Sequence, residues 1–473
     1  MKQKIQSEKL GTEPIPKLLK NLSIPAMIGM FVMALYNVVD TIFISYGVGI
    51  EAVAGVTVAF PIMMIMMAVS AAMGIGGASV ISRRLGAKRE KEANQVFGNI
   101  ISVILMISVV GFIAAFTVLE PMLRLFGANQ EVLGYATEYM FPILLGTFFF
   151  SFAFATNNIV RSEGNAKFAM MTMIIPAVIN IILDPIFIFG LNMGVQGAAI
   201  ATVISQASVS VVILRYFLTG KSSLQLNVAD LKIKVSIIKE VIAVGLPAFA
   251  QQAAGSVMMI AINTMLIRFG GEMHVGVFGI IQRIIMFTVM PMMGVMQGMQ
   301  PIVGYNYGAK NFDRLRETVI LGLKVTIFFS FLIFGLVMAV PHWLMMIFTS
   351  DVAVIEAGVE YLRIMFAAVF LIGVQVIGSG LYQALGKPKQ ALILSLSRQL
   401  IFLIPLVLIL PHFFGVYGVW MAFPISDFFA CILAGTLLYR DRAIFFGKGK
   451  NKDQDRTQNQ DQDHPITATP NGL

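Results

Sequence analysis

Long apolar runs alternate with short polar segments over most of the 473 residues of the chain. A helix needs ~20 predominantly apolar residues to cross the hydrocarbon core of a bilayer. Twelve runs meet this requirement, at 22–45, 52–80, 96–119, 135–157, 168–190, 194–218, 243–267, 276–303, 318–340, 361–383, 392–411 and 416–438. The pattern predicts an all-α polytopic membrane protein with twelve transmembrane helices. The second and eighth runs are long, so we expect those helices to tilt or to bend, for example at the GIGG sequence of residues 74–77.

The composition supports a membrane protein and narrows the function. The chain is 57% hydrophobic and 12% charged, whereas about a quarter of a soluble chain is charged. The formal net charge is +9, but the basic residues form short blocks between apolar runs, which does not indicate a nucleic-acid partner. The single Cys431 excludes an internal disulfide, and the four His residues are far apart in the sequence. We therefore expect no metal site built from Cys or His.

The charges between the runs predict how the helices cross the membrane. Lys and Arg gather in alternate segments, at 1–21, 81–95, 158–167, 215–240, 304–317, 384–390 and 439–473, and the other loops hold only Arg124 and Arg268. Cytoplasmic loops are the ones enriched in basic residues. We therefore expect a multi-pass protein of the cell membrane with both termini in the cytoplasm. The polar start and the long first apolar run do not resemble a cleavable signal peptide.

The second half of the chain repeats the first at an offset of 222 residues, which becomes 221 near the end, where Gly194 falls on Gly415. Pro25 falls on Pro247, and the Gly-Ala-Lys sequence at 86–88 falls on 308–310. Each repeat holds six spans, so both halves run in the same direction and a pseudo-two-fold axis along the membrane normal should relate them. The expected organisation is a cytoplasmic N-terminal segment (1–21), a first six-helix half (22–218), a cytoplasmic linker (219–242), a second six-helix half (243–438) and a cytoplasmic tail (439–473), disordered over 447–473.

Two acids inside the membrane break this repeat. Asp40 and Asp184 fall on Ile262 and Leu406, so repetition of the architecture does not explain them. An ionised acid at the centre of a bilayer costs on the order of 3 kcal/mol on insertion scales, and such acids usually face a cavity and serve an ion pathway. Both acids lie near the outer ends of outward-running spans, roughly 8–9 Å below the edge at ~1.5 Å per residue.

Two neutral polar residues should join these acids. Asn180 lies one helical turn from Asp184, and Thr202 reaches a similar depth on the next span. Two close carboxylates with little water need a shared proton or a small cation, and the amide and hydroxyl oxygens suit Na⁺. Pro185 removes a backbone donor and offers a bend beside the site. The alternative is structural, with Asp184 capping a kink and Asp40 bonding a neighbouring helix.

The second half holds one intramembrane acid and several polar residues. Asp427 lies within about one helical turn of the depth of Arg398, which favours a structural ion pair over a second proton site. Residues that could line a substrate cavity are Gln251, Gln252, Gln282, Arg283, Met290 and Gln375. Arg283 could instead snorkel or bond carbonyls. Flexible Met side chains, here 31 in number, suit a cavity that accepts many shapes, although ordinary packing explains any one of them equally well.

Several of these stretches together resemble one family, the multidrug and toxic compound extrusion (MATE) antiporters, from about residue 15 to 440. The resemblance rests on two six-span halves, NxxxDP at 180–185, RSEGN at 161–165 and LGAKREKEAN at 85–94, and it is strongest to the prokaryotic DinF-like or MepA-like branch. It implies a V-shaped fold and a monomer. It also implies export of amphipathic, often cationic drugs or dyes by alternating access, without a cofactor, in exchange for H⁺ or Na⁺ bound at Asp40, Asn180, Asp184 and Thr202. The NorM-like branch places coupling acids in spans seven and ten, and 243–267 and 361–383 contain none.

Three other classes of function fit the sequence less well. An enzyme is disfavoured, because the nearest nucleotide motif, GLYQALGKP at 380–388, has the wrong glycine spacing and Pro388 where a Ser or Thr is needed. A flippase or exporter of lipid-linked or other anionic metabolites would need a strongly cationic cavity, for which Arg283 is the main candidate. A channel would conduct passively, without a coupled counter-ion. The sequence leaves open the substrate and the choice between H⁺ and Na⁺.

Overall fold

The structure, a computed structural model, describes residues 4–445, which contain helices and no strands. The predicted disordered tail at 447–473 lies outside these residues. The first part of the chain forms α1 (Lys4–Thr12), α2 (Ile15–Gly47), α3 (Ile50–Gly86), α4 (Glu90–Thr117), α5 (Leu119–Leu125), α6 (Gln130–Leu145), α7 (Thr147–Ser162), α8 (Ala166–Pro185), the π-helix η1 (Ile186–Gly190) and α9 (Gly194–Leu218).

A linker that contains the 3₁₀ turn η2 (Val228–Leu231) joins this half to the second. The second half forms α10 (Val235–Gly270), α11 (Glu272–Gly308), α12 (Phe312–Ala339), α13 (Pro341–Met346), α14 (Val352–Phe366), the 3₁₀ turn η3 (Val369–Leu371), α15 (Ile372–Ala384), α16 (Pro388–Leu396), the π-helix η4 (Ser397–Leu403), α17 (Ile404–Ile409), α18 (Pro411–Phe414), α19 (Val416–Arg440) and α20 (Arg442–Phe445). The bounds of α3 and α4 reappear in α11 and α12 at the offset that the sequence repeat predicts.

The helices supply the twelve predicted spans, one of them broken. Eleven helical segments are long and apolar enough to cross a membrane, and the pair α6 and α7, bent by 61°, makes the twelfth. The break falls at Gly146, where a Cβ atom would lie 2.7 Å from Val203 of α9. The GIGG glycines lie inside the continuous helix α3. A Cβ atom on Gly74 would lie 2.9 Å from Cα of Ala155, and one on Gly76 would lie 2.1 Å from the Val241 carbonyl oxygen. These glycines therefore allow close packing, and the expected tilt or bend stays a prediction.

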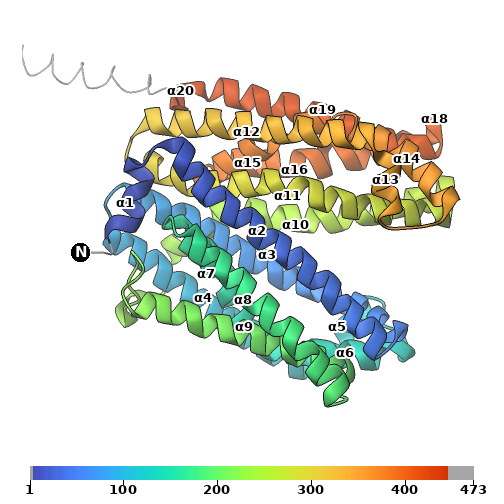
Figure 1. Ribbon diagram of the computed structural model, residues 1–473. Coiled ribbons are helices and arrows are strands. Elements are labelled where there is room, and N and C mark those ends of the chain that lie inside the picture. The colour runs from blue at the N-terminus through green and yellow to red at the C-terminus, as the bar shows by residue number, and fades with distance from the viewer. Residues whose placement is uncertain (1–3, 446–473) are drawn as a thin grey trace, which may run out of the picture.

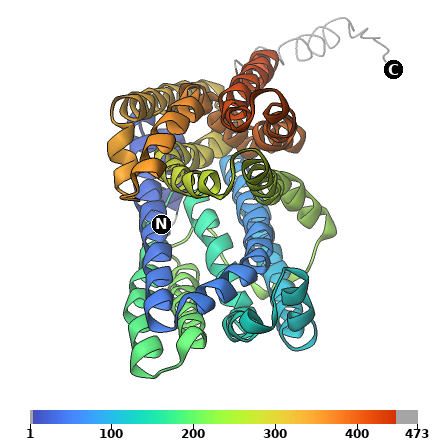
Figure 2. The ribbon, with the colours of Figure 1, turned by 90° about the vertical axis from the view of Figure 1, so that its right-hand side faces the viewer.

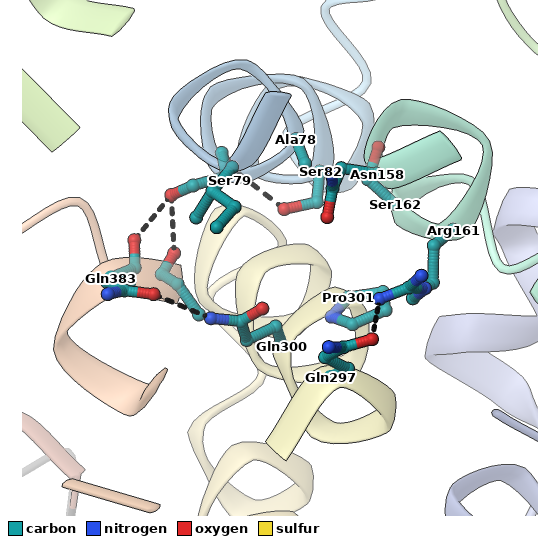
Figure 3. A pocket seen from close by; sticks show the side chains of 12 residues that line it. Ala78, Ser79, Ser82, Asn158, Arg161, Ser162, Gln297, Gln300, Pro301 and Gln383 are labelled. Carbon is teal, nitrogen blue, oxygen red and sulfur yellow. Dashed lines mark hydrogen bonds between the residues drawn. The ribbon is translucent and has the colours of Figure 1, made fainter. Parts of the chain in front are cut away.

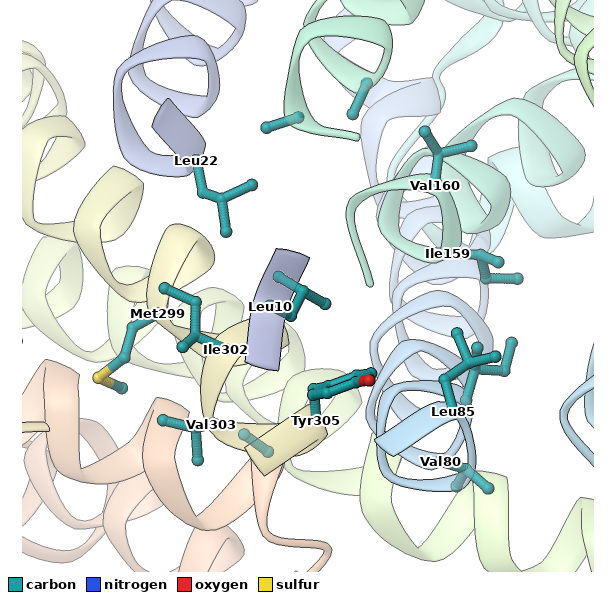
Figure 4. Close-up of a cluster of buried hydrophobic side chains, with 14 of the residues drawn as sticks. Leu10, Leu22, Val80, Leu85, Ile159, Val160, Met299, Ile302, Val303 and Tyr305 are labelled. Atoms are coloured by element: carbon teal, nitrogen blue, oxygen red, sulfur yellow. The ribbon is translucent and has the colours of Figure 1, made fainter. Parts of the chain in front are cut away.

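The two halves meet at one end and separate at the other, as the fold class predicts. In Figure 1 the helices converge near the N-terminus, whereas α5 and α6 lie far from α13 and α18. Figure 2 looks at the molecule from the right-hand side of Figure 1, where these helices lie. The buried apolar residues divide accordingly. One cluster, here the shared core, takes residues from both halves, including Leu22, Val80, Met299 and Val303 (Figure 4).

Two further clusters lie entirely within one half each. The first-half cluster surrounds Ile44 and Leu123, and the second-half cluster surrounds Ile262 and Trp420. Burial of apolar surface holds helices together, so the halves are joined where the core is shared and free to diverge where it is divided. The result is the V shape.

We call the region where the two halves share a core the junction. There, glycine residues allow the backbones of the two halves to come into contact. A Cβ atom on Gly86 would lie 1.9 Å from the Tyr305 carbonyl oxygen, and one on Gly308 would lie 2.0 Å from the Arg83 carbonyl oxygen. Gly86 and Gly308 are equivalent positions of the repeat, and so are Arg83 and Tyr305. The pseudo-two-fold axis therefore relates one contact to the other. Two ion pairs add to the junction, since Glu240 of α10 binds Arg83 at 3.3 Å and Arg84 at 3.0 Å.

Candidate functional site

The structure brings the four residues predicted for the cation site together in the first half. Asp40 comes from α2, Asn180 and Asp184 from α8, and Thr202 from α9. The Asn180 amide donates to the Thr202 hydroxyl at 3.2 Å. The Asp40 and Asp184 carboxyl groups lie close enough to influence each other electrostatically. Asp184 is fully buried and Asn180 is 1% exposed. Three helices therefore converge on one buried polar site.

Three of the four carboxyl oxygens of this site have no hydrogen-bond donor among the described residues. Both oxygens of Asp184, Oδ1 of Asp40 and Oδ1 of Asn180 have no hydrogen-bond partner among the described residues. Buried polar atoms are nearly always paired, so each exception calls for an explanation. Two acids and an amide oxygen offer hard oxygen ligands, which suit a proton shared between the acids or a small cation such as Na⁺. This chemistry fits the predicted ion. The structural alternative required Asp184 to cap a kink, and its carboxyl oxygens accept no hydrogen bond in the described chain.

Two tyrosines also belong to the site, and the sequence pattern did not indicate them. Tyr36 of α2 interacts with the Thr202 hydroxyl and lies near both acids, and Tyr139 of α6 also lies near Asp40 and Asp184. Tyr36 precedes Asp40 by one helical turn, so its place on the same face could have been inferred. Only the packing of α6 against its neighbours places Tyr139.

The helix that carries Asp184 changes its geometry directly after the acid. Helix α8 ends at Pro185, and the π-helix η1 continues the span to Gly190. Proline has no backbone N–H to donate, and π segments are rare and frequent at functional sites. The sequence predicted a bend at Pro185, and the structure places a wider helical turn there.

The intramembrane acid of the second half has a different environment. Asp427 of α19 is 3% exposed, and its Oδ1 accepts a hydrogen bond of 2.5 Å from Nε of Arg398 in η4. The predicted pair is therefore present. Its charges compensate each other within the protein, unlike those of Asp40 and Asp184. The position equivalent to Asp40, Ile262, is fully buried in the second-half cluster.

The residues predicted to line a substrate cavity divide into three groups. Gln251 and Gln375 line a cavity of about 100 Å³ between the halves, together with Met293 and Met296. Gln252 donates to the sulfur of Met64 across the halves at 3.5 Å, and Gln282 donates to that of Met259 at 3.3 Å. Arg283 is exposed and Met290 is half-buried, and neither lines this cavity.

A second, smaller cavity adjoins the first at the junction. Its volume is about 20 Å³, and Figure 3 shows that side chains of both halves surround it. Five residues line both cavities, namely Ile75, Asn158, Gln297, Gln300 and Gln383. The wall is rich in amides. Gln300 donates to Oε1 of Gln383 at 2.9 Å, and Ser79 donates to the Gln383 carbonyl oxygen at 2.6 Å.

The RSEGN sequence at 161–165 ties α7 to the linker. Glu163, which follows α7 outside the predicted hydrocarbon region, is fully buried. It accepts hydrogen bonds from the Ser222 hydroxyl at 2.6 Å, the Ser223 backbone N–H at 2.9 Å and the Tyr216 hydroxyl at 3.2 Å. Burial raises the pKa of the Glu163 carboxyl to about 7, and these donors offset only part of the effect.

Known proteins match most of the chain. The MatE family model matches residues 25–186 and 247–409, one stretch in each half. The multidrug export protein MepA of Staphylococcus haemolyticus is 27% identical over 427 residues, which cover 89% of this chain and 93% of that protein. The structure of the MATE multidrug transporter DinF-BH in complex with the dye rhodamine 6G is 70% identical, has a TM-score of 0.87, and covers 94% of this chain and 100% of its own. A MOP superfamily transporter from Pyrococcus furiosus is 30% identical with a TM-score of 0.86, over 93% of this chain and 98% of its own.

Proposed function

Because the chain belongs to the MatE (MATE) family of multidrug transporters, we propose that it couples drug efflux to a cation bound at Asp40 and Asp184. Multidrug efflux itself follows from its relatives. The observation that carries the cation site is the pair formed by the buried Asp184 and the half-buried Asp40, because three of its four carboxyl oxygens are buried with no hydrogen-bond partner in the described residues. The transporter works as a monomer with both termini in the cytoplasm, and its substrates are amphipathic, often cationic compounds.

Competition for negative charge provides the coupling. In the V-shaped state the site in the first half faces the divided end of the molecule, which the positive-inside rule assigns to the outside. A cation entering there neutralises the acid pair, which weakens the binding of a cationic drug and favours its release. The two ligands must therefore not bind equally well together, and a differential of ~1–3 kcal/mol is sufficient for coupling.

Rhodamine 6G is a suitable test substrate, since the 70% identical transporter was solved with this dye bound. The purified protein in liposomes should move the dye under an imposed pH gradient or an imposed Na⁺ gradient, applied separately to identify the ion. Asp184→Asn and Asp40→Asn should lose gradient-driven dye transport by ~10-fold or more, because the amide can neither take up a proton nor balance a cation.

The matched control is Asp351→Asn, the same change at an exposed acid that caps α14 through its side chain. Asparagine caps helices as well as aspartate does, so transport should remain. Normal coupled transport by Asp184→Asn would refute the cation site. Dye flux without any gradient would support a channel. No dye transport by the unmodified protein, together with translocation of a lipid-linked sugar, would support the flippase.

A further inference from the structure

A buried guanidinium at the junction has no acid beside it among the residues that the structure describes. Arg161, the last arginine of α7, is 6% exposed. One of its Nη atoms donates to Oε1 of Gln297 in the other half, and the second donates to Oδ1 of Asn157 at 2.6 Å. Its Nε has no partner, and no carboxylate in the described residues lies within ion-pair distance. Only neutral amide oxygens therefore compensate the charge.

Such an arrangement is unfavourable unless something else supplies a negative charge. A buried ion that lacks a counter-charge loses its hydration without a Coulombic gain. Three partly buried guanidiniums of the same chain do have acids, since Arg83 and Arg84 bind Glu240 and Arg398 binds Asp427. Arg161 differs from them in one further respect, because it lines the 20 Å³ cavity.

We propose that Arg161 and Gln297 form a subsite for the carboxylate of zwitterionic or anionic amphipathic substrates. A planar guanidinium binds a carboxylate through two parallel hydrogen bonds, and charge-assisted bonds of this kind are the strong ones. The Gln297 amide accepts from Arg161 and donates to the sulfur of Met30 at 3.3 Å, a weak acceptor. Its N–H groups can therefore turn to an incoming carboxylate at small loss.

The cavities set the size of the group that enters. The 20 Å³ beside Arg161 exceeds the ~10–15 Å³ that one water molecule needs, and a carboxylate oxygen fits where a pyrophosphate does not. The adjoining 100 Å³ accepts a small apolar arm, such as one aromatic ring, against Met293 and Met296. The body of a drug then stays outside, between the halves.

This subsite is separate from the cation site. Gln297 contacts Met30, which precedes Asp40 by ten residues on α2, or roughly 15 Å along the helix. A substrate need not bridge the two. The inference rests on the proposed export of amphipathic compounds, but it adds a determinant of substrate charge that Asp40 and Asp184 do not provide.

Two dyes that differ in one group test the subsite. Rhodamine 19 carries a free carboxylate, and rhodamine 6G is its ethyl ester. Fluorescence polarisation with the purified full-length protein should show binding of both. Arg161→Gln should weaken the binding of rhodamine 19 by roughly 10- to 100-fold, the range for a hydrogen-bonded charge, and should change that of rhodamine 6G much less. Transport in liposomes should follow the same order.

A second variant distinguishes loss of the subsite from misfolding of Arg161→Gln. Gln297→Glu places a carboxylate against Arg161, so the contact between the halves is kept while the guanidinium is occupied from within. The binding of rhodamine 19 should again fall selectively. Gln196→Glu adds the same charge at an exposed position in the first turn of α9 and should leave the ratio of the two affinities unchanged.

The outcomes separate this subsite from the proposed function. Equal losses for both dyes in Gln297→Glu, or no change in either variant, would overturn the carboxylate subsite, and so would failure of the unmodified protein to bind rhodamine 19. Failure to bind or move rhodamine 6G would instead refute the proposed efflux of this dye.

Discussion

Glu163 makes the contact between α7 and the linker sensitive to pH. Its folded-state pKa of about 7 lies above the ordinary value of 4.5, so the folded protein holds a proton that the unfolded chain has released. The free energy of unfolding should therefore fall as the pH rises from about 4.5 to about 7, by at most about 3 kcal/mol. Thermal unfolding of the detergent-solubilised protein between pH 5 and pH 8 measures this loss.

Glu163→Gln should flatten this pH dependence, because the amide does not titrate. Glu131→Gln, the same change at an exposed acid in the first turn of α6, should leave it as in the unmodified protein. Identical pH profiles for Glu163→Gln and the unmodified protein would show that the buried carboxyl is not the titrating group.

A site residue can be predicted from the sequence when its residue type is unusual among its sequence neighbours. Asp40 and Asp184 stand out because each interrupts an apolar run that the other half repeats without an acid. Tyr139 is an ordinary residue for the outer end of a span, and only the packing of α6 brings it near the acids. Arg161 belongs to the RSEGN sequence, but the absence of an acid beside it in the described chain depends on all the helices that surround it.

At the scale of helices, hydropathy located the spans but did not predict the sharp bend within one of them. The run at 135–157 reads as one span, and the structure turns it by 61° at Gly146. A sum over apolar residues carries no information on such a turn, because both arms remain apolar. The helix ends that recur in both halves were easier to predict, because residues such as Gly86 and Gly308 mark them at equivalent positions of the sequence.

Close approach of α3 and α10 gives a prediction for the junction. A Cβ atom on Gly245 would lie 2.0 Å from the Ala72 carbonyl oxygen, which is backbone and cannot rotate away. Gly245→Ala should therefore force the helices apart and lower the free energy of unfolding by ~1–3 kcal/mol. Thermal unfolding in detergent measures the change.

Gly255 provides the control on the same helix. A Cβ atom there meets no heavy atom within 4 Å, so Gly255→Ala should leave stability unchanged or raise it by up to ~1 kcal/mol through helix propensity. Equal stability of the two alanine variants would mean that α3 and α10 do not need to touch at Gly245.

At the scale of the whole molecule, cysteine labelling tests the predicted orientation in the membrane. In a Cys431→Ala background, an impermeant maleimide added to intact cells should label Gln130→Cys, at the start of α6, and not Glu90→Cys, at the start of α4. Both positions are exposed, so labelling reports the side of the membrane. Permeabilised cells should label at both, and outside labelling of Glu90→Cys would reverse the topology.

The V shape was accessible from the sequence only through the family resemblance. Hydropathy and repetition predict two similar halves, but they do not say where these halves touch. That depends on which apolar side chains pack across the boundary. Val80 does so in the shared core, whereas Ile262 packs within the second-half cluster. Both residues are equally apolar in the sequence.

The exchanged contacts at the junction have a consequence for how such a chain could arise. Gly86 meets Tyr305 while Gly308 meets Arg83, and a surface on which residue i meets j while j meets i is the mark of a two-fold homodimer. The two halves therefore pack as identical subunits would. Fusion into one polypeptide keeps that interface and frees each copy to diverge. One copy can then carry Asp40 and Asp184 while the other carries Ile262 and Leu406, which a dimer of identical subunits could not do.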